Sequence, residues 1–299
     1  MPIIRHLRHN RVKKESVYLL EYAKSVTSQY GEDGIIERIF ELIGEGSKWC
    51  VEFGAWDGYT HSNTYNLIAN KGWSGIQIEG NARRYEELIK RHGDNPKVHC
   101  IGGMVGLDPR KDSLEFHFAK TPMPKTFDLL VIDIDGNDWH IWKSVTRYRP
   151  RVVMIEINPA ASNEVVYVQD LDFEINQGST LRAMVELGKQ KKYELVCVTS
   201  SNAIFVVEEE FSKIGIEDNS IDSMFYPSRS GSIFMLYDGT MVNVGIPEVA
   251  LRQQDNKRRK LDPFQFQVYS EEERGYGGRV PTELLTADRP ATKAAISEE

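Results

Sequence analysis

Two carboxylates flank a glycine turn in residues 51–58, which read Val-Glu-Phe-Gly-Ala-Trp-Asp-Gly. Glu52 stands before the first glycine and Asp57 before the second. An apolar stretch leads into the turn, so we expect a strand whose end lets the backbone approach a ligand closely. A second apolar stretch, residues 75–79, ends in Glu79, whose carboxylate could bind two ribose hydroxyls. The spacing predicts a site for a nucleoside cofactor.

Two kinds of cofactor carry such a nucleoside. A dinucleotide has a negative pyrophosphate, which Glu52 and Asp57 would repel, and the turn lacks the Gly-x-Gly-x-x-Gly pattern. S-adenosylmethionine has a positive sulfonium and an α-amino group, which the same acids would attract. The turn therefore favours S-adenosylmethionine. The residues expected to contact it are Gln29, Glu52, Gly54, Ala55, Asp57, Gly58, Glu79, Gly80, Asn81 and Asp133.

The densest group of reactive side chains is residues 133–140, Asp-Ile-Asp-Gly-Asn-Asp-Trp-His. Three ionised carboxylates at the end of one strand repel one another, which costs free energy unless a nearby positive charge compensates the repulsion. The candidate catalytic residues are Asp133, Asp135, Asp138 and His140. The aspartates would assist removal of a proton from a substrate hydroxyl, and His140 is the alternative general base. A structural alternative is that Asp138 caps a helix beginning at residue 139 while the other aspartates order the loop.

The same strand ends suggest a metal site. Strand alternation would put Asp133 and Asp135 on one side of the sheet, and Glu156 and Asn158 on one side of the next strand. Carboxylate and amide oxygens suit Mg²⁺, so Asp135, Glu156 and Asn158 are the candidate ligands. A bound Mg²⁺ would hold a substrate hydroxyl and lower its pKa.

These groups require a framework of alternating strands and helices. Seven strands are expected at 48–54, 75–79, 97–102, 127–134, 151–157, 194–198 and 203–207, and helices at 33–43, 82–92, 139–145 and 180–192. The first five strands are nearly continuous in apolar residues, as in strands covered on both faces. Only four residues separate the last two, which predicts an antiparallel hairpin. The fold class is α/β, a doubly wound, mostly parallel seven-stranded sheet with an antiparallel last strand and a small C-terminal addition.

The motifs resemble those of the FkbM-type branch of class I S-adenosylmethionine-dependent methyltransferases. The similarity lies in Ser28-Gln29-Tyr30-Gly31-Glu32-Asp33, in the turn after Glu52, in Glu79 and in Ile132-Asp133-Ile134-Asp135-Gly136, and it covers roughly residues 28–207. The branch more often has Asp-Val-Glu-Gly where this chain has Asp-Ile-Asp-Gly. The resemblance implies O-methylation of a sugar or small secondary metabolite. Some class I O-methyltransferases use a divalent ion, and others do not.

Composition limits the partners and the compartment. The chain has 299 residues, of which 40% are hydrophobic and 27% charged, as in an ordinary globular protein. A net charge of −7 argues against nucleic acid, and no apolar run approaches the roughly 20 residues of a membrane span. Cys50, Cys100 and Cys197 lie in or beside apolar strands, which predicts buried thiols and a cytoplasmic protein. The expected partner is a small-molecule or sugar substrate, and a homo-oligomer is left open.

The chain divides into four predicted parts. Residues 1–46 form an N-terminal arm and helical lid, and residues 47–207 form the cofactor-binding core. Residues 208–262 form an added flap with a hairpin turning at Asp238-Gly239, followed by a solvated basic run at 256–260, and residues 263–299 form a disordered tail. The predicted function is methyl transfer from S-adenosylmethionine to oxygen. The alternatives are a nicotinamide-dependent oxidoreductase and a non-catalytic scaffold that keeps the cofactor fold.

Overall fold

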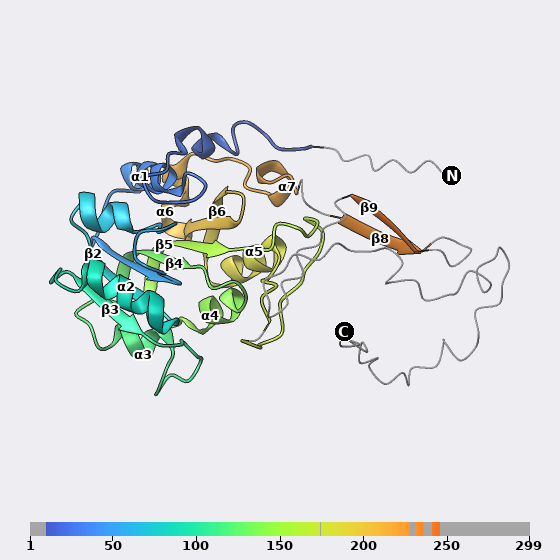
Figure 1. Cartoon of the computed structure of the whole chain (residues 1–299). Helices are drawn as coiled ribbons and strands as arrows, with labels where there is room; N and C mark the ends of the chain where they lie inside the picture. Colours follow the sequence, from blue (N-terminus) through green and yellow to red (C-terminus); the bar gives the residue numbers. More distant parts are fainter. Residues whose placement is uncertain (1–9, 174, 228–230, 236–240, 246–299) are drawn as a thin grey trace, which may run out of the picture.

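The computed structural model describes residues 10–173, 175–227, 231–235 and 241–245. Its centre is a seven-stranded sheet in the order β3-β2-β1-β4-β5-β7-β6 (Figure 1). The strands are β1 (Trp49–Phe53), β2 (Ser74–Glu79), β3 (Val98–Gly102), β4 (Thr126–Ile132), β5 (Arg149–Glu156), β6 (Tyr193–Val198) and β7 (Asn202–Val207). Only β7 runs antiparallel to its neighbours, β5 and β6. The predicted fold class is confirmed.

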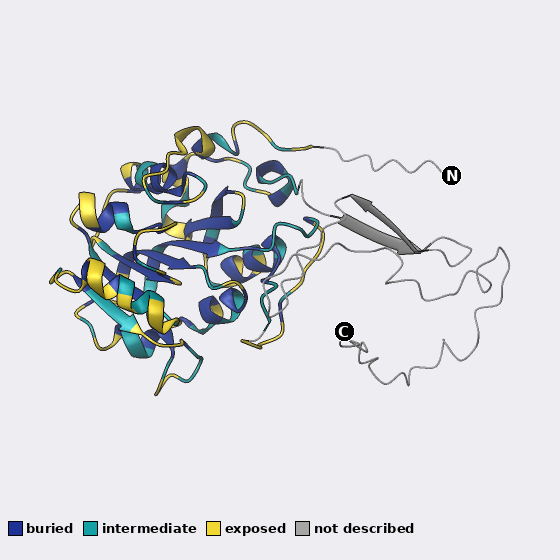
Figure 2. Ribbon diagram, viewed as in Figure 1, coloured by how far each residue is buried: buried dark blue, intermediate teal, exposed yellow. Residues whose placement is uncertain are grey.

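Helices lie on both faces of the sheet, with α1 and α6 on one face and α4 and α5 on the other (Figure 1). The helices are η1 (Tyr18–Tyr22), α1 (Glu32–Ile43), η2 (Asn66–Asn70), α2 (Ala82–His92), α3 (Leu114–Phe118), α4 (Asp138–Ser144), α5 (Leu181–Gln190), α6 (Glu208–Ile214) and α7 (Ile221–Met224). Because both faces are covered, the central strands can be apolar at successive positions. Figure 2 shows these strands as buried.

A single apolar core joins the sheet to these helices. In α1 the apolar residues repeat at helical spacing, and Ile35, Ile39 and Ile43 are buried against the sheet side of the helix. The core also includes Ile214 of α6 and Met224 of α7. The sheet is therefore held from both faces, and its carboxyl edge, where the polar residues lie, is firmly positioned.

Several predicted boundaries differ from the observed ones by one or two residues, and three of them lie beside the acidic residues. The fourth strand was expected to reach residue 134 but ends at Ile132, because Asp135 has φ +61° and leaves the extended conformation. The fifth strand was expected at 151–157 and occupies Arg149–Glu156. The helix expected at residue 139 begins at Asp138.

The C-terminal hairpin is confirmed as an antiparallel pair. Strand β8 (Gly231–Met235) pairs with β9 (Met241–Gly245), and Ser232 lies opposite Val244. The expected turn at 238–239, the basic run at 256–260 and the tail at 263–299 lie outside the described residues. The division into 1–46, 47–207, 208–262 and 263–299 stays a prediction. Within the described ranges, none of the helices has the length and apolar character needed to cross a membrane.

Candidate functional site

A row of residues crosses the carboxyl edge of the sheet at one register level. The last pairs of the parallel strands are Phe53 with Ile78, Phe53 with Ile132, and Ile132 with Ile155. The next residue after each of these belongs to the row: Glu79 after Ile78, Gly54 after Phe53, Asp133 after Ile132 and Glu156 after Ile155. Asn202 of β7, which pairs with Glu156, completes the row. Adjacent strands are about 4.8 Å apart, so the row spans about 19 Å. The site is thus distributed over five strands.

Gly54 stands at the centre of this row. Its φ is +88°, and a Cβ placed there would lie 1.8 Å from the carbonyl oxygen of Asp133. Its N–H and that of Ala55 both donate to the carbonyl oxygen of Ile78, at 3.1 and 3.0 Å. A side chain at Gly54 is therefore excluded by both space and conformation. No residue from 54 to 64 is helical, so no helix begins directly after the turn.

Glu79 connects the turn after β1 to the turn after β2. Its Oε2 accepts the N–H of Trp56 at 2.8 Å, and its Oε1 accepts the N–H of Asn81 at 2.6 Å. A carboxylate has about four acceptor positions, so about two remain for ligand hydroxyls. Asn81 itself is exposed and caps α2 by accepting the N–H groups of Arg83 and Arg84.

The two acids of the turn are engaged within the protein. Glu52 is 3% exposed, and its carboxylate accepts hydrogen bonds from Ser62 Oγ, Asn63 N and Thr64 Oγ1 at 2.6 to 2.7 Å. Burial raises the pKa of Glu52, although these donors oppose the rise. Glu52 was expected to contact the cofactor, but its carboxylate is occupied by one backbone amide and two hydroxyl groups of residues 62–64.

Asp57 caps the same turn further along the chain. Its Oδ1 accepts the N–H groups of Tyr59 and Thr60 at 2.9 and 2.6 Å, and Arg91 lies 3.5 Å away. Burial raises the pKa of Asp57, but these donors and Arg91 outweigh burial and leave it below its ordinary value. The turn closes tightly, since a Cβ on Gly58 would lie 2.6 Å from Leu88 of α2. Asp57 therefore shapes the turn through its own hydrogen bonds.

The lead-in segment before α1 is organised by Asp33. Its Oδ2 accepts the N–H groups of Val26, Thr27 and Ser28 at 2.8 to 2.9 Å. The expected cofactor contact Gln29 follows this turn directly and is exposed. The segment is thus an ordered loop rather than an extended arm.

Three carboxylates form an acidic cluster between β4 and β5, namely Asp133, Asp138 and Glu156. Asp138 is 1% exposed, and burial raises its pKa to about 6. Burial also raises the pKa of Glu156 well above its ordinary value, and the negative charges of Asp133 and Asp138 add to this effect. The carboxyl groups of Asp138 and Glu156 therefore have pKa values above those of exposed carboxyl groups.

Asp138 and Asp135 have distinct positions around this cluster. The carboxylate of Asp138 accepts the N–H of Ile134 at 3.1 Å and that of Gly136 at 2.9 Å, so it orders the loop instead of capping the helix. Asp135 is exposed, and its N–H donates to Glu156 Oε2 at 3.0 Å. The expected shared side of Asp133 and Asp135 is not found, because the strand ends before Asp135 adopts its left-handed φ.

His140 and Asn158 are held by the long loop between β5 and α5. The Nε2 of His140 lies 2.7 Å from the carbonyl oxygen of Gln169, to which it donates. The amide of Asn158 donates to the carbonyl of Gln177 at 2.8 Å and accepts the N–H of Ala160 at 2.9 Å. Both side chains therefore stabilise the loop.

The residues expected to bind Mg²⁺ do not fit that role. The amide oxygen of Asn158 is used in a turn, Asp135 is exposed, and Glu156 is partly buried. Across the described part of the chain, no group of three or more His, Cys, Asp or Glu side chains is arranged to hold a metal ion. The magnesium site predicted from strand alternation is not supported, since that alternation stops at Ile132.

Two residues of the edge were missed by the sequence analysis. Met104, in the loop after β3, is 64% exposed, and a Cβ on Gly80 would lie 2.7 Å from its Sδ. Glu32 is fully buried and joins the lead-in segment to the turn between β6 and β7. Met104 could have been predicted at this edge, because it follows the third expected strand. Nothing near Glu32 in the sequence indicates that its partners lie in the turn between β6 and β7.

The comparisons with known proteins give distant structural neighbours. No family model matches the sequence, and no curated protein matches it. An O-methyltransferase from Bacillus cereus in complex with SAH is 14% identical, with a TM-score of 0.43, and the match covers 65% of this chain and 91% of that one. An S-adenosylmethionine-dependent methyltransferase from Clostridium acetobutylicum is 10% identical, with a TM-score of 0.38 and coverages of 59% and 90%. The CMeT domain of citrinin polyketide synthase is 11% identical, with a TM-score of 0.35 and coverages of 54% and 46%.

Proposed function

We propose that the protein transfers a methyl group from S-adenosylmethionine to a hydroxyl oxygen of a small molecule. The observation that carries this proposal is the arrangement of Gly54 between Glu79 and Asp133. A Cβ on Gly54 would overlap the carbonyl oxygen of Asp133, so only glycine fits this turn, and Glu79 stands at the same level one strand away. A nucleoside can lie across such a turn with its ribose at the second-strand carboxylate.

The geometry of the turn favours S-adenosylmethionine over a nicotinamide dinucleotide. A pyrophosphate is bound at a helix N-terminus directly after the glycine turn, and residues 54–64 contain no helix. The dinucleotide fold also has the parallel order 3-2-1-4-5-6, whereas here the antiparallel β7 lies between β5 and β6. These two features argue against the oxidoreductase alternative.

The residues of the edge have distinct proposed roles toward the cofactor. Glu79 would accept hydrogen bonds from the ribose hydroxyls with its remaining lone pairs. Met104, exposed beside Gly80, would contact the adenine face. Asp133 would face the positively charged end of the ligand, because it stands on the far side of Gly54 from Glu79.

Glu156 is the proposed proton acceptor. When bound, S-adenosylmethionine supplies an activated methyl group on a good leaving group. The protein must then align the hydroxyl and receive its proton. A carboxylate with a raised pKa is a stronger base than an ordinary one. Burial and the negative charges of Asp133 and Asp138 raise the pKa of Glu156. The other candidate catalytic residues have supporting roles around Glu156: Asp133 and Asp138 act through their charge, and Asp135 and His140 through the geometry of their loops. No step is assigned to Mg²⁺.

The resemblance and the cysteines each add a finer proposal. We place the chain in the FkbM-type branch on the motifs at Ser28–Asp33 and 52–58, with a small molecule or sugar as the substrate class. Cytoplasmic localisation is proposed from three thiols that are free in the structure.

Calorimetric titration with S-adenosylhomocysteine and with NADH tests the proposed cofactor. We expect micromolar binding of S-adenosylhomocysteine to the wild type and at least about tenfold weaker binding to Glu79→Gln, since the variant loses a charged acceptor for the ribose. Glu86→Gln, an exposed glutamate on α2, is the matched control and should bind normally. Binding of NADH alone would favour the oxidoreductase, and binding of neither would favour the scaffold.

A further inference from the structure

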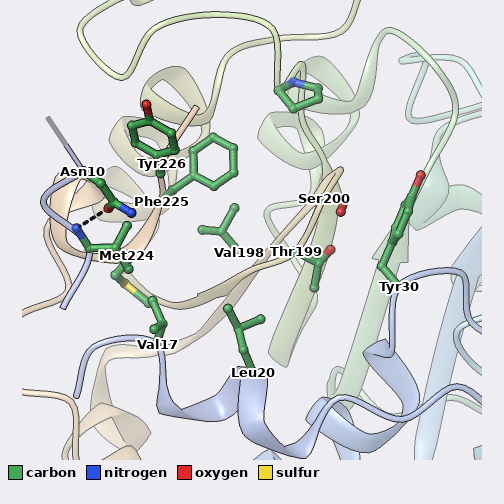
Figure 3. A pocket seen from close by; sticks show the side chains of 12 residues that line it. Asn10, Val17, Leu20, Tyr30, Val198, Thr199, Ser200, Met224, Phe225 and Tyr226 are labelled. Carbon is green, nitrogen blue, oxygen red and sulfur yellow. Dashed lines mark hydrogen bonds between the residues drawn. The ribbon is translucent and has the colours of Figure 1, made fainter. Parts of the chain in front are cut away.

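A pocket lies at the same edge of the sheet, beyond the acidic cluster (Figure 3). Its volume is about 480 Å³, within the range of small-molecule sites. Its walls come from the N-terminal segment, the loop before α1, the loop after β5, the end of β6 and the residues around the end of α7. Figure 3 shows Tyr30 on one side, Met224 and Phe225 on the other, and Thr199 and Ser200 between them.

Two parts of the pocket wall lie close in sequence to the proposed proton acceptor or to its strand partner. Pro159, in its wall, follows Glu156 by three residues. Thr199, also in the wall, precedes Asn202 by three residues, and Asn202 pairs with Glu156 across β5 and β7. The order along the edge is therefore Glu79, the glycine turn, the acidic cluster and the pocket.

The walls of the pocket are apolar with a few hydroxyl groups. Twelve described residues line it, and none of these twelve carries a formal charge. Seven of the twelve are apolar, whereas Tyr30, Thr199, Ser200 and Tyr226 carry hydroxyls and Asn10 carries an amide. A charged ligand would lose its hydration here without gaining a counter-charge, and the apolar majority of the walls would leave some hydroxyls of a sugar unpaired. The walls select an uncharged, largely apolar molecule with one or two hydroxyls.

We propose that this pocket binds the methyl acceptor, and that the acceptor is an uncharged, largely apolar alcohol or phenol. This inference rests on the proposed methyl transfer. The hydroxyl oxygen forms a bond to the methyl carbon, the methyl–sulfur bond breaks with its electron pair staying on sulfur, and the hydroxyl proton passes to Glu156. The products are a methyl ether and S-adenosylhomocysteine.

Glu32 is the positioning residue of this pocket. Its Oε2 accepts the N–H of Tyr30 at 2.7 Å, and its Oε1 accepts Thr199 Oγ1 at 2.8 Å and Asn202 Nδ2 at 3.2 Å. One buried carboxylate thus joins the aromatic wall at Tyr30 to the hydroxyl wall at Thr199. Because Asn202 also pairs with Glu156, the same contacts set the pocket relative to the acidic cluster.

Fluorescence titration of the full chain with 2-naphthol, a neutral aromatic alcohol, tests the pocket without requiring turnover. Leu20 is 38% exposed and lines the pocket, so Leu20→Glu adds a charge there with little risk to folding. We expect about tenfold or greater loss of 2-naphthol binding in this variant. Val26→Glu, at a residue 42% exposed and outside the lining, is the matched control and should bind as the wild type does.

The comparison ligands are 2-naphthoate, which adds a charge to the same ring, and methyl glucoside, which is mostly polar. Both should bind at least about tenfold more weakly than 2-naphthol. Equal binding of 2-naphthol to all three proteins, no binding to the wild type, or tighter binding of either comparison ligand would overturn the proposal. Titration with S-adenosylhomocysteine separates this from the proposed function: cofactor binding without 2-naphthol binding removes only the acceptor inference, whereas loss of cofactor binding removes the methyl transfer on which it rests.

Discussion

Glu156 owes its raised pKa to groups that come from other parts of the chain. The carboxyl group is partly buried at the end of β5, and Asp133 and Asp138 add negative charge from the loop after β4. Its Oε2 accepts the N–H of Asp135, whose left-handed φ turns the loop toward β5. Burial, together with the charges of Asp133 and Asp138, thus raises the pKa of the proposed proton acceptor.

Removing the charge of Asp133 should lower the pKa of Glu156. In Asp133→Asn the like-charge repulsion disappears while burial remains, so we expect the pKa of Glu156 to decrease but to stay above its ordinary value. The pKa can be followed by the ¹³C chemical shift of the Glu156 carboxyl, assigned by its loss in Glu156→Gln. Asp94→Asn, at an exposed position, is the control. An unchanged titration of Glu156 in Asp133→Asn would show that Asp133 does not set this pKa.

At the scale of elements, the lead-in segment and the β6–β7 hairpin form one unit. The contacts run through Glu32, the first residue of α1, to Tyr30 in the loop before it and to Thr199 and Asn202 at the hairpin. Glu32 is 167 positions from Thr199 and 170 positions from Asn202 in sequence. The pocket therefore depends on an interaction between elements that each fold locally.

Glu32→Gln should loosen the pocket while leaving the cofactor turn unaffected. An amide offers one acceptor oxygen where the carboxylate offers two, so Tyr30 N or the Thr199–Asn202 pair loses its acceptor. We expect about tenfold weaker binding of 2-naphthol, less than about twofold change for S-adenosylhomocysteine, and faster amide exchange at Tyr30. Glu41→Gln, on the exposed side of α1, is the control. Equal losses for both ligands would indicate a general folding defect instead.

At the scale of the whole molecule, the acidic cluster links stability to pH. The folded-state pKa of Glu156 lies above its unfolded value of about 4.3, so the folded protein holds a proton that the unfolded chain has released. The folded state is therefore favoured below about pH 4.3, and this advantage is lost as pH rises toward the folded pKa. The carboxyl group of Asp138 likewise favours the folded state below its ordinary pKa of about 3.9. This contribution is lost as pH rises to its folded-state pKa of about 6.

Glu156→Gln should remove this component of the pH dependence. Relative to the wild type, the variant should gain stability on going from pH 5 to pH 8, by about 1.4 kcal/mol for each pH unit by which the folded pKa exceeds 5. Urea unfolding at both pH values measures the difference. Glu164→Gln, at an exposed position in the β5–α5 loop, should show the wild-type dependence. A stability difference that is the same at pH 5 and pH 8 would mean that Glu156 has an ordinary pKa.

Local sequence was sufficient for the elements and for the centre of the site. Apolar periodicity located all seven strands and the principal helices, because burial on two faces leaves a continuous signal in each segment. The glycine turn and Glu79 were also predictable, since their positions at strand ends imply a shared edge once the strands are parallel. The short spacing of the last two strands correctly predicted their antiparallel pairing.

Tertiary structure decided what each polar side chain does. Glu52, Asp57 and Asn158 look like ligand-binding residues in sequence but are engaged by backbone and hydroxyl groups of their own loops. The raised pKa of Glu156 and the role of Glu32 depend on neighbours from distant segments, and no local pattern encodes those distances. Periodicity reports which face of an element is buried, whereas hydrogen-bond partners and charge environments arise only when the elements pack together.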